Sequence, residues 1–112
     1  MKSFTLTITL ASFALLACAR VQMPRPTEAD GARASGRWPG SSRASLERGR
    51  SLYVARCSVC HQPVEPTSIP AAEWPTHISD MKQRAGLSEE EARLIEQYLV
   101  TMASPPPLQA QR

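Results

Sequence analysis

The residues best suited to chemistry stand together in the stretch ARCSVCHQP. Two thiols, Cys57 and Cys60, are separated by two residues, and His61 follows directly. The rest of the chain holds one more cysteine, Cys18, and one more histidine, His77. Thiols and imidazoles bind metals, exchange disulfides and attach prosthetic groups, so this spacing allows several chemistries.

Most of these chemistries require residues or structural elements that the sequence does not contain. A structural zinc site takes four ligands, and the chain has two histidines and no second cysteine pair. A thioredoxin-like dithiol belongs in a βαβ unit, and no strand pattern is visible. A disulfide across two residues would add little to a fold. The spacing Cys-x-x-Cys-His instead predicts one covalently bound haem c, with Cys57 and Cys60 joined to it by thioether bonds and His61 as the proximal iron ligand.

Composition divides the chain into four parts. Residues 1–17 are predicted to form a signal peptide of the lipoprotein type. Residues 18–44 are rich in Pro, Gly and Arg and show no helical or strand periodicity, which predicts a flexible tether. A domain over residues 45–104 is so small that a cofactor is expected at its centre. Residues 105–112, PPPLQAQR, predict a disordered tail.

The N-terminal segment MKSFTLTITLASFALLAC has one positive residue followed by a short apolar run. Such a run is too short to cross a bilayer as a helix but suits a signal peptide. Its end, LLAC, resembles the lipobox of bacterial lipoproteins, which implies a lipid on Cys18 and a place on the periplasmic side of the cell envelope. In Gram-negative lipoproteins, a residue other than aspartate after the cysteine, here Ala19, would favour the outer membrane. An ordinary secretory peptide cut after LACA, with Cys18 lost, is the alternative.

A second iron ligand is expected from a helix over residues 74–85, which has a proline in its first turn. On that helix Trp74, Ile78 and Met81 share one apolar stripe, with His77 at its edge. We predict Met81 as the distal ligand. His77, Met102 on the next helix, and an open or water-bound position are the alternatives.

Other apolar residues are expected to shape the interior. Tyr53, Trp74 and Ile78 are predicted to pack against the haem. The following helix opens with Ser88 and Glu91, which form a capping box. Its apolar face is expected to pack against the helix that leads into Cys57.

The segments GRSLYVARCSVCH and AEWPTHISDMKQRAGLSEEEARLIEQYL together resemble a short bacterial single-haem cytochrome c domain. The resemblance covers most of residues 45–103. It implies an all-α fold of about three helices packed around the haem, and a methionine shortly after the tryptophan as distal ligand. It also implies export, because bacteria attach haem c outside the cytoplasm.

These features predict an electron carrier rather than an enzyme, because no nucleophile with a base and oxyanion donors is present. The expected partners are a redox donor, a redox acceptor and a membrane reached through the lipid. Residues 45–103 hold six Lys or Arg against eight Asp or Glu. The basic face that nucleic-acid binding requires is therefore not expected. A haem subunit of an envelope oxidoreductase complex, and a sensor or enzyme with an open haem position, are the alternative functions.

Overall fold

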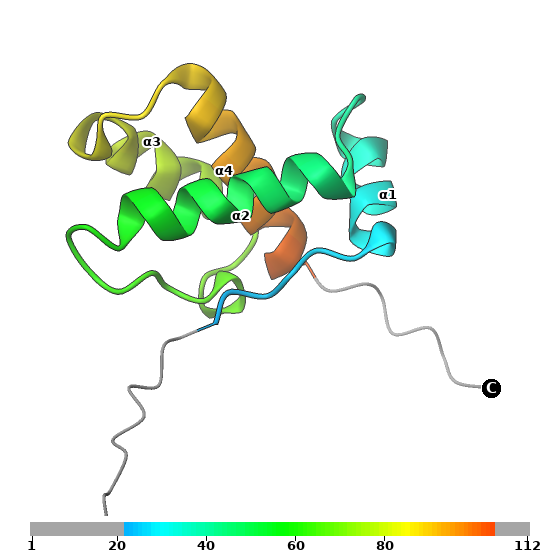
Figure 1. The fold of residues 1–112 in the computed structure, drawn as a ribbon, viewed down its shortest axis with the longest axis horizontal. Helices are drawn as coiled ribbons and strands as arrows, with labels where there is room; N and C mark the ends of the chain where they lie inside the picture. Colours follow the sequence, from blue (N-terminus) through cyan, green and yellow to red (C-terminus); the bar gives the residue numbers. More distant parts are fainter. Residues whose placement is uncertain (1–21, 105–112) are drawn as a thin grey trace, which may run out of the picture.

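The computed structural model describes residues 22–104, and every regular element in this range is helical (Figure 1). In chain order the elements are α1 (Glu28–Arg37), α2 (Arg43–Cys57), the 3₁₀ turn η1 (Pro66–Ser68), α3 (Trp74–Ala85) and α4 (Glu89–Ala103). The predicted all-α fold is confirmed, with four α-helices in this range where about three were expected. The predicted signal peptide, Cys18 and the tail over 105–112 lie outside the described residues.

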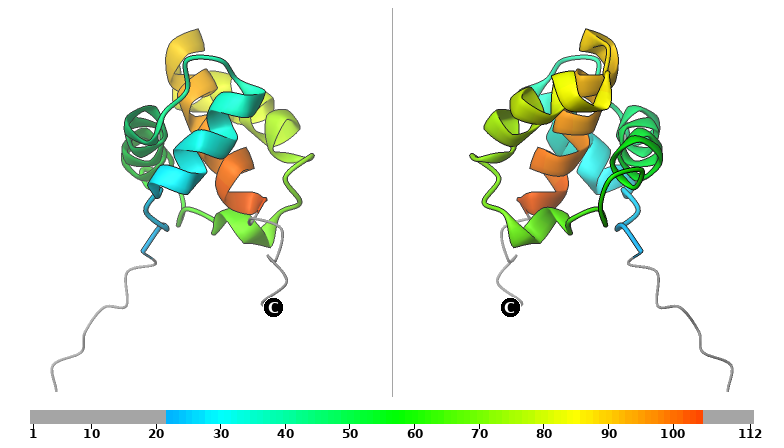
Figure 2. Two further views of the ribbon diagram at one scale, coloured as in Figure 1. Left: turned by 90° about the vertical axis from the view of Figure 1, so that its right-hand side faces the viewer. Right: turned by 90° about the vertical axis from the view of Figure 1, so that its left-hand side faces the viewer.

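Helix α4 forms the centre of the domain, and α1, α2 and α3 all pack against it (Figure 1 and Figure 2). Its residues Ile95, Tyr98 and Leu99 are 0% exposed. Burying a large apolar side chain of this kind contributes roughly 1.5–3 kcal/mol. The apolar face expected on this helix is therefore the core of the domain.

Helices α2 and α4 cross in direct backbone contact at Gly49. A Cβ atom at this position would lie 2.1 Å from the carbonyl oxygen of Leu94 and 3.0 Å from the Cβ of Tyr98. No side chain fits in this space, so glycine lets the two helices approach this closely. The packing predicted between these helices is confirmed.

Local sequence signals set the ends of the helices around the site. At the start of α4 the Glu91 N–H donates to Ser88 Oγ at 3.1 Å, and the Ser88 N–H donates to a Glu91 carboxylate oxygen at 2.9 Å. This is the predicted capping box. Helix α3 has Pro75 in its first turn, and Gly86 caps it after Ala85 with a φ of 63°, the left-handed conformation that glycine adopts readily.

Residues 22–44 are the main departure from expectation, because they belong to the folded domain and are not a flexible tether. Helix α1 packs against both α2 and α4. The residues that α1 buries are Asp30, Gly31 and Ala34, which are small or polar. The apolar periodicity by which such a helix is usually recognised is therefore missing from the sequence.

A short polar network fixes helix α1. Thr27 and Asp30 form a capping box at its start, and the Arg33 guanidinium donates to Asp30 Oδ1 at 2.5 Å. Burial alone would raise the pKa of Asp30, but hydrogen bonds from Thr27 and Arg33 lower it below its ordinary value. The ionised carboxylate thus holds Arg33, which also donates to the carbonyl oxygens of Thr101 and Ser104 at the end of α4.

None of the helices within residues 22–104 combines the length and the apolar character that a membrane crossing requires.

Candidate haem site

Helix α2 delivers the first cysteine and ends there. Cys57 is the last residue of α2 and is 8% exposed, whereas Cys60 and His61 lie on the following turn and are exposed. Both thiols are free, so no disulfide joins them. Burial, and after it the nearby Cys60, raises the pKa of the Cys57 thiol. The pair is therefore available as thiols for two covalent bonds to a prosthetic group.

A cavity of about 190 Å³ opens beside this turn, between the end of α2 and helix α3. It is lined by Arg56, Cys57, Cys60, His61, Met81, Arg84 and Ala85. Two thiols, an imidazole and a thioether thus face one cavity. The structure brings together the four side chains that the sequence singled out, two for haem attachment and two for binding the iron.

The His61 ring is oriented by the carbonyl of its own neighbour. His61 Nδ1 lies 2.9 Å from the carbonyl oxygen of Gln62. A carbonyl can only accept, so Nδ1 is the donor in this contact, and Nε2 is the ring nitrogen left available to a metal. Farther along the same loop, the Pro66 carbonyl accepts from Trp74 Nε1 at 2.9 Å.

The three candidate distal ligands occupy different surroundings. Met81 lines the cavity with His61 and the two cysteines. His77 is exposed, and its ring lies against Trp74 with 6.0 Å between the ring centroids. Met102 is partly buried against the hydrophobic core on α4. The geometry therefore favours Met81, while its role as an iron ligand stays a prediction.

The residues expected to pack against the haem build the walls behind the cavity. Tyr53, Trp74 and Ile78 are buried in the core cluster and are not among the residues that line the cavity. The Tyr53 hydroxyl donates to the Val64 carbonyl at 2.7 Å, and its ring meets Trp74 edge-on at 6.2 Å. They fix α2, α3 and the connecting loop relative to one another. Their contact with haem remains a prediction.

The donor set at the cavity suits haem c better than a bare metal ion. No group of three or more His, Cys, Asp or Glu side chains among residues 22–104 could hold a metal. The cavity instead offers two thiols for vinyl groups, and an imidazole nitrogen and a thioether sulfur for the two axial positions of an iron. The residues present therefore fit a covalently bound haem.

Comparison with known families agrees with this chemistry. A family model described as dihaem cytochrome c matches residues 53–110. The chain belongs to the dihaem cytochrome c family. Searches of curated proteins and of solved structures found no match. Membership of this family implies a cytochrome c domain with covalently bound haem c and a role in haem-based electron transfer, in agreement with the prediction.

Two arginines of this cytochrome c domain were missed as cavity residues. Arg56 and Arg84 line the cavity together with Met81. Arg56 also donates to the carbonyl oxygens of Ala85 and Gly86. Its position directly before Cys57 was the available signal, but contacts of this kind depend on how α2 and α3 meet, which the sequence alone does not specify.

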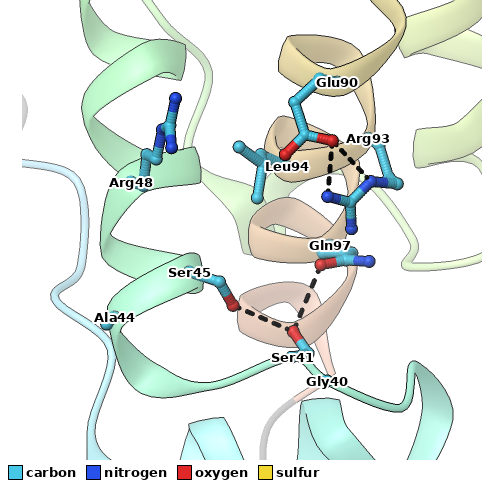
Figure 3. Close-up of a pocket in the computed structure, with 9 residues that line it drawn as sticks. All are labelled: Gly40, Ser41, Ala44, Ser45, Arg48, Glu90, Arg93, Leu94 and Gln97. Atoms are coloured by element: carbon cyan, nitrogen blue, oxygen red, sulfur yellow. Dashed lines mark hydrogen bonds and ion pairs between the residues drawn. The ribbon is translucent and has the colours of Figure 1, made fainter.

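A larger cavity, of about 320 Å³, lies at the opposite end of α2 from the haem motif (Figure 3). Most of its polar side chains bond to one another: Ser41 to Ser45 and Gln97, and Arg93 to Glu90. Arg48 lies on the α2 wall, and no interaction joins it to the other residues drawn (Figure 3). None of the predicted haem ligands lines this cavity, which lies between the start of α2 and α4.

Proposed function

We propose that this member of the dihaem cytochrome c family carries a single haem and transfers single electrons. The observation that carries the proposal is the cavity shared by Cys57, Cys60, His61 and Met81. Cys57 and Cys60 would hold the haem by thioether bonds. His61 Nε2 and the Met81 sulfur would fill the two axial positions, which leaves no open position for a small molecule.

The number of haems is argued from the cysteines. The family name refers to two haems, but the 112 residues contain one Cys-x-x-Cys-His motif and only one other cysteine, Cys18. Two thiols are required for each haem attached in this way. One haem per chain is therefore the loading that these residues support.

The residues of the site would prepare the iron for one-electron exchange. A bound haem would supply the Fe(II)/Fe(III) couple. The hydrogen bond from His61 Nδ1 to the Gln62 carbonyl holds the imidazole in one tautomer and orientation. A thioether as the other ligand raises the reduction potential relative to two imidazoles.

A partner surface is supported by the positions of the exposed apolar side chains. The large hydrophobic residues exposed within residues 22–104 are Val54, Val59 and Val64, at 38%, 79% and 37% exposure. All three lie in the short stretch that carries the haem motif. Apolar contact beside the cofactor would suit a redox donor and a redox acceptor, including a partner in an oxidoreductase complex.

We further propose that the protein acts on the periplasmic side of a bacterial envelope, anchored by lipid on Cys18, with the outer membrane favoured. Cys18 to Gln22 is four residue steps, which span at most about 14 Å when fully extended. Because residues 22–44 are folded, the anchor would hold the cytochrome domain close to the membrane. The long tether first expected would have let it swing freely.

Spectroscopy and mass on the full chain, matured in a bacterial envelope, test this function. The intact mass should include one haem, and lipid on Cys18. The oxidised protein should show a sulfur-to-iron charge-transfer band in the far red, which Met81→Ala abolishes and Met102→Ala leaves unchanged. Slow carbon monoxide binding to the reduced protein is expected. A colourless protein whose Cys57 and Cys60 both alkylate would contradict the haem, and fast carbon monoxide binding would favour a sensor or enzyme.

A further inference from the structure

Arg56 links the two helices that carry the ligands of the proposed haem. It is the penultimate residue of α2, directly before Cys57. One of its terminal nitrogens, Nη2, lies 3.0 Å from the carbonyl oxygen of Ala85 and 2.9 Å from that of Gly86. Those two carbonyls stand at the C-terminal end of α3, one helical turn beyond Met81.

The carbonyls that Arg56 binds need a partner from outside their own helix. The last carbonyls of an α-helix have no intrahelical donor. At the end of α3 the Gly86 N–H donates to Gln83 and the Leu87 N–H to Lys82, so these bonds satisfy carbonyls farther back. The Arg56 guanidinium donates to two carbonyls farther on, those of Ala85 and Gly86. Its positive charge also complements the negative end of the α3 dipole.

The same guanidinium reaches the start of α4. Arg56 Nη1 lies 3.9 Å from a carboxylate oxygen of Glu91. Glu91 closes the capping box with Ser88, and the hydrogen bond from the Ser88 N–H is the main cause that lowers the pKa of this carboxyl. Arg56 therefore meets an ionised carboxylate as well as two carbonyls, at the junction of α2, α3 and α4.

The ring contact between Tyr53 and Trp74 joins α2 to the first turn of α3, and Arg56 joins α2 to its last turn, beside the cavity. Both helices pack chiefly against α4, and the cavity lies between the end of α2 and the last turns of α3. Apolar burial is non-directional, so contacts with α4 resist separation of the helices more than they fix the tilt of α3. A hydrogen-bonded link at the cavity edge would fix that tilt at the place where Met81 has to meet the iron.

We propose that Arg56 is a positioning residue that holds α3, and with it Met81, at bonding distance from the iron of the haem attached to α2. This inference rests on the proposed function, in which Met81 is the distal ligand. Without the link, α3 spends more time displaced and the sulfur leaves the iron more often. Any small ligand would then enter at a rate set by that open fraction.

Three variants of the full, haem-loaded chain test the proposal. Arg56→Gln removes the charge and the forked donor. Arg56→Lys keeps the charge but offers a single ammonium in place of the guanidinium. Arg48→Gln is the matched control, because Arg48 is on the same helix and lies in the cavity at the other end of α2 (Figure 3). Haem content and thermal unfolding are measured first for all of them.

The readouts are the far-red sulfur-to-iron band of the oxidised protein and the rate of carbon monoxide binding to the reduced protein. Arg56→Gln should weaken the band and speed carbon monoxide binding about tenfold, since charge-assisted hydrogen bonds are lost. Arg56→Lys should fall between Arg56→Gln and the unmodified protein. Arg48→Gln should leave both readouts unchanged.

Each contrary outcome overturns a different statement. If the unmodified protein holds haem but lacks the band, Met81 is not the ligand and the proposed function fails. If the band is present and Arg56→Gln matches Arg48→Gln, the positioning role of Arg56 is wrong. If Arg56→Lys matches the unmodified protein, a positively charged N–H donor is sufficient and a specific need for the guanidinium is wrong. If Arg56→Gln fails to mature with haem, the comparison of Arg56→Lys with the unmodified protein still tests the positioning role of the Arg56 guanidinium.

Discussion

Tyr53 shows how a single buried polar atom supports the candidate site. Its hydroxyl donates to the Val64 carbonyl at 2.7 Å, which ties the loop after His61 to helix α2. Its side chain is 3% exposed. Burial, and after it the neighbouring Cys57, raises the pKa of Tyr53 to about 12, and the hydrogen bond to Val64 opposes the shift. The folded protein therefore favours the neutral phenol.

This pKa predicts an alkaline loss of stability. Because the folded-state pKa of Tyr53 lies above the ordinary value near 10, its contribution is complete below pH 10 and disappears as pH rises through 12. Burial, the larger cause, remains when Cys57 is bound to haem, so thermal unfolding of the haem-loaded protein should show a steeper fall in Tm over that range than Tyr53→Phe shows. Tyr98, whose pKa burial also raises, is present in both proteins. Parallel Tm curves would contradict the assignment to Tyr53.

For single residues, the sequence predicted the chemistry of the site better than it predicted the contacts between side chains. The spacing of Cys57, Cys60 and His61 follows from covalent requirements, so it can be recognised without a fold. Met81 could be chosen because helical periodicity places it on an apolar stripe. The acceptor for His61 and the partners of Arg56 could not be chosen, since they depend on local backbone geometry and on how two helices meet.

At the scale of the helices, the crossing of α2 and α4 depends on Gly49. Gly49→Ala would place a methyl group 2.1 Å from the Leu94 carbonyl oxygen, so the helices would have to move apart. We expect a loss of about 3 kcal/mol or more in the free energy of unfolding. Gly36→Ala is the control: this exposed position of α1 has no atom within 4 Å of its new Cβ and should gain about 0.5–1 kcal/mol. Chemical denaturation measures both, and equal effects would show that Gly49 is not a close contact.

The helices that were predicted well are those with strong local signals. Helix α4 has the Ser88 capping box and a continuous apolar face, and α3 has Pro75 and a terminal glycine. Helix α1 was missed because its packed side is formed by glycine and alanine. Gly31 lies so close to the start of α2 that a Cβ would stand 2.5 Å from the Arg43 nitrogen. Such close packing of small residues produces no hydrophobic periodicity. The Gly and Arg residues of α1 are also typical of a linker.

At the scale of the whole molecule, the segment before α2 closes one side of the core. Met23 is 3% exposed within the core cluster. Its carbonyl accepts from Arg50 Nε at 3.0 Å, and the Pro24 carbonyl accepts from the Tyr98 hydroxyl at 2.8 Å. Figure 1 shows this segment running along α2 before it enters α1. The folded domain therefore includes residues 22–44, about twenty residues more than composition indicated.

Two truncations measure how much this segment contributes. A chain of residues 22–104, exported behind a foreign signal peptide, keeps the described domain, whereas residues 45–104 match the domain predicted from composition. The shorter chain exposes core apolar surface and leaves the buried Tyr98 hydroxyl without its acceptor, a loss of several kcal/mol. For a domain of this size we expect Tm to fall by more than about 10 °C relative to residues 22–104. Both chains retain every proposed haem ligand, so haem content is compared before unfolding. Equal Tm values would mean that residues 22–44 are dispensable and that the tether interpretation was sound.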